Sequence, residues 1–590
     1  MEAGLNQRGP VATALDGETP PVARGNAPAR TASLPAWLTL EVALYAGLLA
    51  LAAGLRLFAL GSAPLSAAEA QSAVAAWHIA RGEATDLVYG PTPLYSTAAV
   101  FFLLGANDLA ARLLPALAGL WVVAWPYFVR EQLGRPAALG TTLLLATSPS
   151  LVLASRSASG EMVALGLALL ATLAWLRFRR GGGELPLAVA AVAAGLTVAS
   201  GPAAIALLLP VGLAVAGTAL AHGAWPEELL VSPGAWRRAG KWAALALVGA
   251  ATGLLSQPYG LQGGVIESAA AWLAGPATDG RAWSFYLIGL PVYEPTVLVL
   301  AALGLVFCRW ERARLEFLFL WAALALAVYS LVGAKPSGLL AFVAFPLALA
   351  GGRALAALWE VARERMGLAD IGLFLAAGAP IVAMGGHVAS YLALPGRTIS
   401  SAVMMVPVAL FIFLVGAWSY WRGTEGPFYG TGCLLAVVLL GAGLHTSTAL
   451  AFTNASNPAE LLVGTATSPD LRRLVTEVAD HEAVLGTPGR HDITLAVDAQ
   501  LRYPLAWYFR DYTRLTYFSG TPPQATAVIA SADAQPPTGS YKYQRYTLMT
   551  SATLAPASLG EAWRWLVYRD YGGPQQRRDA QLFVATQAIN

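Results

Sequence analysis

The sequence predicts a polytopic α-helical membrane protein with about 13 transmembrane helices, followed by a small α/β domain at the C-terminus. Three observations support this fold class. The chain of 590 residues is 56% hydrophobic and only 12% charged, whereas soluble proteins carry about 25% charged residues. Apolar stretches of roughly 17–25 residues, long enough to cross a bilayer, recur up to residue 451. Residues 452–590 lose this pattern and resemble an ordinary soluble domain in composition.

The composition also excludes some classes of protein. A single soluble core is excluded because such cores stop growing near about 250–300 residues. The net charge of only +3, with no basic face, argues against a nucleic-acid partner. Lipid is the solvent that suits such a composition, and we expect an integral protein of the plasma membrane.

The N-terminal segment 1–34 is polar and rich in Pro, Ala and Gly, which predicts a disordered cytoplasmic tail. The first apolar run, 37–60, is too long for the core of a cleavable signal peptide. We therefore expect three parts: a tail (1–34), a transmembrane domain (35–451) and an extracytoplasmic α/β domain (452–590).

The transmembrane helices are predicted from the apolar runs. The predicted spans are 37–60, 109–129, 137–153, 162–177, 185–200, 203–221, 242–257, 292–308, 315–333, 339–357, 370–391, 401–420 and 429–451. Basic residues cluster in alternate loops, as at Arg177, Arg179 and Arg180, which predicts a cytoplasmic N-terminus. An odd number of spans then places the C-terminal domain outside.

The short apolar segment 94–104 is predicted to be a re-entrant or interfacial helix on the outer face, because counting it as a span reverses every later loop. In the C-terminal domain, 468–482 has the pattern of an amphipathic helix. Segments 493–497 and 525–530 are typical of buried strands, and 503–512 is an aromatic helix start or turn.

Acidic residues in the outer segments are the candidates for chemistry, because ionisable groups near a membrane are often functional. Glu69 lies on the first turn of a helix that Ser66 can cap, where the helix dipole alone also favours an acid. Arg156 and Glu161 are either functional groups or a local ion pair. His78 is either an interfacial histidine or a base or metal ligand.

Four segments, in order, carry a resemblance to a known family. They are the acid in the first outer loop (67–70), a Pro-Leu-Tyr turn (89–95), a Gly-x-x-Asp-x-x-x-Arg segment (105–115) and a Ser-Pro-to-Glu segment (148–161). Together they resemble the GT-C superfamily, the polytopic glycosyltransferases of the protein-mannosyltransferase and family-39-like kind. Segments 285–295, 460–470 and 503–512 resemble one branch of it, the flippase-associated glycosylation proteins of archaea and some bacteria.

The resemblance implies transfer of a sugar from a polyprenyl-phosphate donor to an acceptor on the outer face. It implies that Glu69 acts as the base and that Glu161 orients it or holds a metal. A divalent metal is possible by the same resemblance, although no cofactor is certain. The implied partners are the lipid-linked donor, membrane lipids and an envelope glycosylation or flippase protein. The candidate substrate-binding residues are Arg156, Lys335, Arg281, His78, Tyr89 and Tyr293.

The sequence departs from the family pattern at one central position. The family usually has Asp-Glu in the first outer loop, and here the pair is Ala68-Glu69. The alternative is therefore a catalytically inactive GT-C-fold protein that binds lipid-linked glycans or assists their export. A transporter ranks third, because broken helices with charges at the membrane midplane are expected there and these spans contain few charges.

Overall fold

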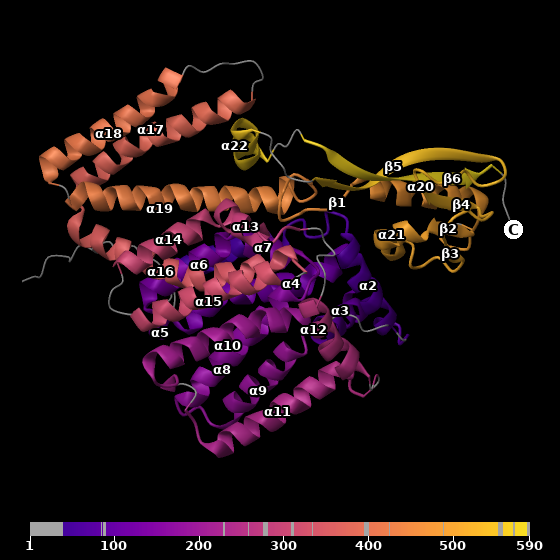
Figure 1. Cartoon of the computed structure of the whole chain (residues 1–590), viewed down its shortest axis with the longest axis horizontal. Coiled ribbons are helices and arrows are strands. Elements are labelled where there is room, and N and C mark those ends of the chain that lie inside the picture. Colours follow the sequence, from indigo (N-terminus) through magenta and orange to yellow (C-terminus); the bar gives the residue numbers. More distant parts are fainter. Residues whose placement is uncertain are drawn as a thin grey trace, which may run out of the picture. The chain divides into compact units, whose positions relative to one another are not determined.

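The computed structural model describes residues 39–83, 85, 90–227, 230–255, 257, 259–274, 281–307, 312–332, 334–393, 401–423, 425–487, 489–552, 558–569 and 573–586. The chain divides into two compact units, Met1–Ala43 and Leu44–Asn590. The second unit contains the helical bundle and the C-terminal sheet (Figure 1). The predicted tail, 1–34, lies outside the described residues.

Helices form most of the bundle. They are α1 (Leu40–Leu57), α2 (Ala67–Ala80), α3 (Pro91–Leu104), α4 (Asp108–Phe128), α5 (Arg130–Leu133), α6 (Arg135–Thr147), α7 (Pro149–Arg156), α8 (Glu161–Arg179), α9 (Glu184–Val198), α10 (Pro202–His222), α11 (Pro233–Ala251), α12 (Ser268–Ala274), α13 (Phe285–Tyr293), α14 (Pro295–Phe307), α15 (Arg312–Leu331), α16 (Leu340–Arg365), α17 (Leu368–Ala393), α18 (Ser401–Arg422) and α19 (Glu425–Thr448). Short π-helical or 3₁₀ turns occupy Gln262–Glu267, Ser337–Leu339 and Ala449–Thr453.

The predicted helical class is confirmed, but the predicted number of spans is not. Each predicted span overlaps a helix or a broken helix pair. In the described chain, however, only six helices are long and apolar enough to cross a membrane, or eight if each of two bent pairs is one span. The difference arises because helices such as α9 are shorter than a full span. The segment predicted as interfacial forms α3, which is also too short to span.

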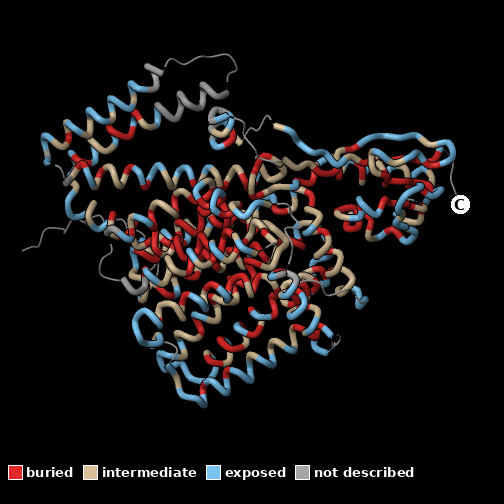
Figure 2. The backbone as a smooth tube through the Cα atoms, viewed as in Figure 1, coloured by how far each residue is buried: buried red, intermediate tan, exposed pale blue. Residues whose placement is uncertain are grey.

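The core of the bundle lies along α16, which packs against α6, α14 and α15. In its most apolar window 83% of the residues are buried, whereas the corresponding shares for α1 and α19 are 22% and 28%. Figure 2 shows buried residues concentrated at the centre of the bundle, whereas most described residues of α18 are exposed or half-buried. Large apolar side chains exposed on the outer helices are expected where lipid is the solvent.

The bent pair α6–α7 turns by 57° at Ser148. Pro149 has no N–H, so the carbonyl of Leu145 loses its helical partner there. The buried Arg56 of α1 fills the gap, with its guanidinium donating to the carbonyls of Leu145 (2.9 Å) and Ala146 (3.1 Å). A break at membrane depth is tolerated where protein groups satisfy the freed backbone, and Arg56 supplies those groups.

The bent pair α13–α14 turns by 87° at Glu294, and this break meets the first one. Glu294 is 1% exposed. Its Oε1 accepts hydrogen bonds from the hydroxyls of Ser148 and Ser150, both at 2.6 Å, and from the Ser150 amide at 2.9 Å. The two breaks therefore stabilise each other through one carboxyl group.

The C-terminal domain is a six-stranded sheet with order β1-β5-β6-β4-β2-β3. Its strands are β1 (Ala466–Thr467), β2 (Leu495–Asp498), β3 (Leu515–Phe518), β4 (Ala527–Ser531), β5 (Tyr541–Ala552) and β6 (Gln575–Ala585). Its helices are α20 (Asp470–Leu485), α21 (Arg502–Tyr508) and α22 (Leu559–Tyr568), with a 3₁₀ turn at Ala499–Leu501. Strand β2 is parallel to β3 and β4, whereas β4, β5 and β6 pair antiparallel.

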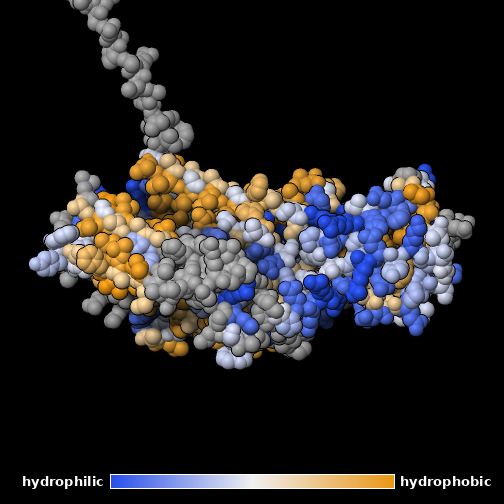
Figure 3. Space-filling model, turned by 90° about the horizontal axis from the view of Figure 1, so that it is seen from above, coloured by the Kyte–Doolittle hydropathy of each residue, from blue (hydrophilic) through white to orange (hydrophobic). Residues whose placement is uncertain are grey.

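The predicted helix and the two predicted strands of this domain correspond to α20, β2 and β4. The buried faces of these elements share one apolar core that includes Leu471, Leu495 and Ile529. Figure 3 shows hydrophilic side chains gathered over this domain and apolar side chains over the helical bundle. This difference in surface is the one expected between water-facing and lipid-facing protein.

Candidate active site

Glu69 lies at the start of α2, where the sequence predicts a capped helix. The Ser66 hydroxyl accepts from the Glu69 amide (3.3 Å), and the Glu69 carboxylate accepts from the Ser66 amide (2.9 Å). This reciprocal pair is a capping box, which satisfies two backbone donors at a helix start. Ala68, on the same turn, is exposed.

The Glu69 carboxylate also forms a nearly buried ion pair with Arg112 of α4. The side chains are 11% and 7% exposed. Arg112 Nε and Nη2 donate to the two carboxylate oxygens at 2.9 and 2.8 Å, and the amide of Ala158 donates at 2.8 Å. Burial on its own raises the pKa of Glu69, but the charge and hydrogen bonds of Arg112 outweigh it and hold this pKa below its ordinary value.

Each Glu69 oxygen therefore accepts two hydrogen bonds, counting Ser66. Such a carboxylate has little remaining capacity to accept a proton from a substrate. Its bond to Ala158 also fixes the segment that leads to Glu161, three residues later. Arg112 itself donates to the carbonyls of Leu60, Ala63 and Pro64, so the pair ties the first loop to α4.

Asp108, at the start of α4, binds the C-terminal domain. Its carboxylate accepts from Arg472 (2.8 Å), from the Trp507 indole (2.8 Å) and from the Tyr508 hydroxyl (3.0 Å). The sequence analysis did not single out Asp108 or Arg112. The sequence did contain a feature that could have identified them, because Asp108 and Arg112 are the two charged residues of the Gly-x-x-Asp-x-x-x-Arg segment.

Glu161 is the second predicted acid, at the first position of α8. It is 7% exposed, and its Oε2 is buried with no hydrogen-bond partner in the described residues. The carboxyl group lies against Gly338, since a Cβ placed on that glycine would be 2.9 Å from the carboxyl carbon. A side chain at position 338 would therefore require the Glu161 carboxyl group to move.

The segment 334–338, beside Glu161, also contains Lys335. This residue is 4% exposed, and its ammonium group donates to the carbonyl of Val332. Arg281 Nη1 donates to the carbonyl of Lys335 (2.6 Å), and Tyr286 donates to that of Pro336 (2.8 Å). Glu161 and Arg281 thus both lie against the segment that contains Lys335. Glu69 is connected to the residues before Glu161 through the hydrogen bond that it accepts from the Ala158 amide.

Three helix N-termini meet beside Glu161. Helices α3, α8 and α10 begin directly after Gly90, Gly160 and Gly201. A Cβ on Gly90 would lie 2.2 Å from the carbonyl oxygen of Ser200, and one on Gly160 would lie 3.4 Å from Pro93. Helix N-termini carry partial positive charge, so their convergence favours a carboxylate or a phosphate group nearby.

The remaining predicted residues lie in different surroundings. Arg156 donates to the carbonyls at the end of α1, including those of Leu55 and Phe58. His78 is half-exposed and pairs with Glu83 at 2.6 Å. Tyr293 is fully buried and donates to Glu460. These three side chains have protein partners, and Tyr89 lies outside the described residues.

A divalent metal does not fit the acids as they are arranged. Within the described ranges, no three His, Cys, Asp or Glu side chains come together. Glu69 is also occupied by a guanidinium and two amides, which leaves it poorly suited as a ligand for a hard cation that requires several oxygen ligands. No step below depends on a metal.

Comparison with known proteins gives a family match over part of the chain and a structural similarity over nearly all of it. Residues 89–232 match the family model of dolichyl-phosphate-mannose-protein mannosyltransferases. No curated protein sequence matches the chain. The crystal structure of ArnT from Cupriavidus metallidurans bound to undecaprenyl phosphate has a TM-score of 0.56 at 17% identity, over 93% of this chain and 99% of ArnT. The same protein in its apo state has a TM-score of 0.53 at 16% identity, over 94% and 100%. At these identities the similarity establishes a shared fold.

Proposed function

Because this chain is an integral membrane protein with the fold of the GT-C glycosyltransferases, we propose that it is a membrane glycosyltransferase. In this proposal it transfers a sugar from a polyprenyl-phosphate-linked donor to an acceptor at the outer face. The single observation that carries it is the buried Glu161 Oε2, which has no hydrogen-bond partner among the described residues and lies against the segment 334–338, where three helix N-termini meet. The undecaprenyl phosphate bound to ArnT supports a lipid of this class as the donor's carrier.

The proposed reaction is an inverting displacement at the anomeric carbon. Glu161 Oε2 accepts the proton of the acceptor hydroxyl, because a general base needs a free lone pair within reach of that proton. The acceptor oxygen then forms the new bond to the anomeric carbon. The bond from that carbon to the phosphate oxygen breaks, and the leaving polyprenyl phosphate keeps the electron pair.

The leaving phosphate needs positive groups to stabilise its developing charge. Lys335 has one hydrogen bond in the described chain, which leaves two ammonium hydrogens for a phosphate. Arg281 contributes a second positive charge at the same segment. We therefore assign Lys335 and Arg281 to phosphate binding, and Glu69 to positioning the loop before Glu161.

A second candidate function is favoured by Ala68. If the missing aspartate is indispensable, the protein is an inactive GT-C-fold protein that binds lipid-linked glycans or assists their export. The saturated hydrogen bonding of Glu69 supports this alternative as well, because Glu69 then cannot replace the aspartate.

The proposal keeps the topology that the charge pattern predicts. The N-terminus is cytoplasmic, about 13 helical segments cross the membrane, and the C-terminal domain lies outside. We keep two further predictions from the sequence. The chain is closer to the flippase-associated branch than to other branches, and it has a flippase or another glycosylation protein as its partner.

The test uses purified protein in liposomes with radiolabelled polyprenyl-phosphate sugars and an envelope extract as acceptor. The wild type is expected to release polyprenyl phosphate and to label the acceptor. Ala68→Asp is the discriminating variant, and we expect its rate to stay within a few-fold of the wild type. A wild type that binds the donor without turnover, combined with new activity in Ala68→Asp, would reject the transferase proposal in favour of the inactive alternative.

A further inference from the structure

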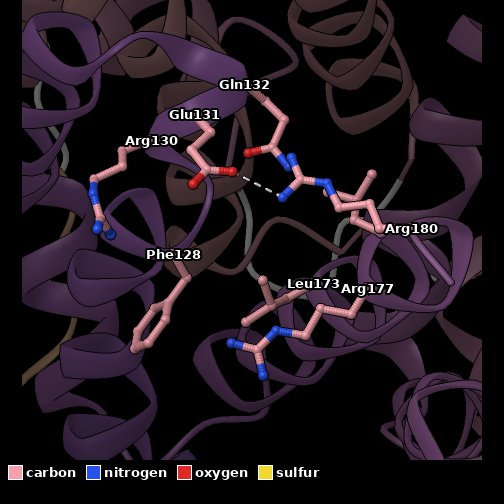
Figure 4. Close-up of a pocket in the computed structure, with 8 residues that line it drawn as sticks. Phe128, Arg130, Glu131, Gln132, Leu173, Arg177 and Arg180 are labelled. Carbon is pink, nitrogen blue, oxygen red and sulfur yellow. Dashed lines mark hydrogen bonds and ion pairs between the residues drawn. The ribbon is translucent and has the colours of Figure 1, made fainter. Parts of the chain in front are cut away.

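A basic pocket lies at the far end of α8 from Glu161. Its volume is about 140 Å³, and its lining comes from α4, α5 and α8 with the residues beside them. The lining residues are Phe128, Arg130, Glu131, Gln132, Leu173, Leu176, Arg177 and Arg180 (Figure 4).

This pocket is separate from the candidate active site. Helix α8 has 19 residues, and its rise of about 1.5 Å per residue places its two ends roughly 28 Å apart. That distance is close to the thickness of the bilayer hydrocarbon core, about 30 Å. The pocket therefore lies at the opposite membrane surface from Glu161.

The charges in the pocket favour an anion. Three arginines, Arg130, Arg177 and Arg180, and one carboxylate, Glu131, line the pocket. Arg180 pairs with Glu131 at 3.0 Å, and Arg130 stacks over Tyr127 with its Cζ 4.1 Å from the ring centroid. The Arg177 side chain is exposed and has no ion pair or hydrogen bond within the described ranges. A net positive charge therefore remains, with Arg177 available to bind an anion.

The apolar part of the lining indicates a lipid rather than a free ion. Phe128, Leu173 and Leu176 are the apolar residues of the lining. Phe128 is 42% exposed and Leu117, further along α4, is 49% exposed, so apolar surface continues from the pocket along α4. A phosphodiester headgroup with acyl chains matches both features, because the head meets arginines while the chains cover leucine and phenylalanine side chains.

We propose that this pocket binds the phosphodiester headgroup of an anionic membrane phospholipid. Basic pockets between transmembrane helices on the cytoplasmic side are known to bind such headgroups. Arginine suits the role, because its planar fork donates two hydrogen bonds to one phosphate. The lipid at this site is a resident membrane lipid, distinct from the sugar donor of the proposed function.

Native mass spectrometry of the detergent-solubilised full chain tests the proposal, with titration of dioleoyl phosphatidylglycerol and, separately, phosphatidylcholine. The test variant is Arg177→Gln combined with Arg180→Gln. The matched control is Arg237→Gln, an exposed arginine on α11 that does not line the pocket. We expect the wild type and the control to retain one phosphatidylglycerol in preference to phosphatidylcholine.

The double variant is expected to bind phosphatidylglycerol about 30-fold more weakly, since each basic group near a membrane surface contributes a factor of about five. Because both arginines are exposed, its melting temperature should match the control. The single variant Arg177→Gln, with about a fivefold loss, serves if the double variant is unstable.

Equal affinity for the two lipids, or equal affinity in the wild type and the double variant, would overturn the proposal. Competition with inorganic phosphate distinguishes a lipid headgroup from a free phosphate ion as the ligand of this pocket. If millimolar phosphate displaces phosphatidylglycerol completely, the site binds a free phosphate and the lipid assignment is wrong. Failure of sugar transfer leaves this result unaffected, because the assay measures lipid binding alone.

Discussion

At the residue scale, Glu69 and Glu161 are two carboxylates with opposite hydrogen-bonding environments. Glu69 accepts four hydrogen bonds and pairs with Arg112, whereas Glu161 keeps a buried oxygen without a partner in the described chain. A residue that is fully bonded stabilises the fold, and a residue with an unused acceptor is available to a substrate. This difference separates a positioning role from an acid–base role.

Glu69→Gln is expected to destabilise the protein by about 3–5 kcal/mol, because it leaves the nearly buried Arg112 without its counter-charge. The pH dependence has a definite sign. The pKa of Glu69 is lower in the folded protein, so its stabilising contribution is present above its unfolded pKa of about 4.3 and is lost as the pH falls through the folded value.

Thermal melts of wild type and Glu69→Gln between pH 7 and pH 3 check this prediction. The difference in melting temperature is expected to be constant near neutral pH and to shrink below about pH 4. A difference that is the same at pH 3 and pH 7 would contradict the ion-pair role. Glu83→Gln, which removes an exposed carboxylate near the end of α2, is the control.

The sequence predicted both acids as candidates but not their partners. Glu69 and Arg112 are 43 positions apart, and nothing in a single sequence reports that a helix start and a later helix meet. The substrate-binding roles of Arg156 and Tyr293 were predicted from the family resemblance and stay predictions. In the structure the Arg156 side chain donates to the carbonyl of Leu55 and the Tyr293 hydroxyl donates to Glu460.

At the element scale, the apolar runs predicted the positions of the helices but not their breaks. A hydrophobic stretch specifies burial in lipid, and hydropathy does not distinguish one straight helix from two bent ones. Pro149 and Pro295 each follow a break. Arg56 stabilises the first break by donating to the freed carbonyls. In the sequence this residue appears only as one charge inside an apolar run.

Arg56→Met is expected to lower the free energy of unfolding, because it leaves the carbonyls of Leu145 and Ala146 unsatisfied. Each buried carbonyl without a hydrogen-bond partner costs about 1–3 kcal/mol. Arg56→Lys is expected to be intermediate, since one ammonium lacks the planar fork that reaches both carbonyls. Unfolding in detergent measures both variants, and a methionine variant as stable as the wild type would show that the break does not need Arg56.

At the scale of the whole molecule, the C-terminal domain is joined to the bundle through polar contacts on the first loop and α4. Arg472 donates to the carbonyls of Gly61 and Ser62 and to Asp108, and the Trp507 ring stacks on Phe101 at 5.5 Å. The sequence predicted the helix and two strands of this domain. It did not predict β5 and β6, because their polar stretches lack a hydrophobic signature.

Asp108→Ala is expected to loosen this junction, because it leaves the Trp507 and Tyr508 donors without their acceptor. Each lost partner costs about 1–3 kcal/mol. Hydrogen exchange should become faster in α21 and in the loop before α2, while the centre of α16 is unchanged. Asp511→Ala, on an exposed residue of the same domain, is the control. Unchanged exchange in α21 would contradict the role given to Asp108.

The central claim is that Glu161, rather than Glu69, performs the acid–base step of sugar transfer. The most direct measurement compares kcat/KM and melting temperature for Glu161→Gln and Glu69→Gln in the same liposomes. The account predicts that Glu161→Gln loses about 10²–10⁴-fold in turnover, with donor affinity and melting temperature near those of the wild type. Glu69→Gln should melt earlier, while its folded fraction keeps turnover within about tenfold. Wild-type turnover in Glu161→Gln, with folded but inert Glu69→Gln, would contradict the account.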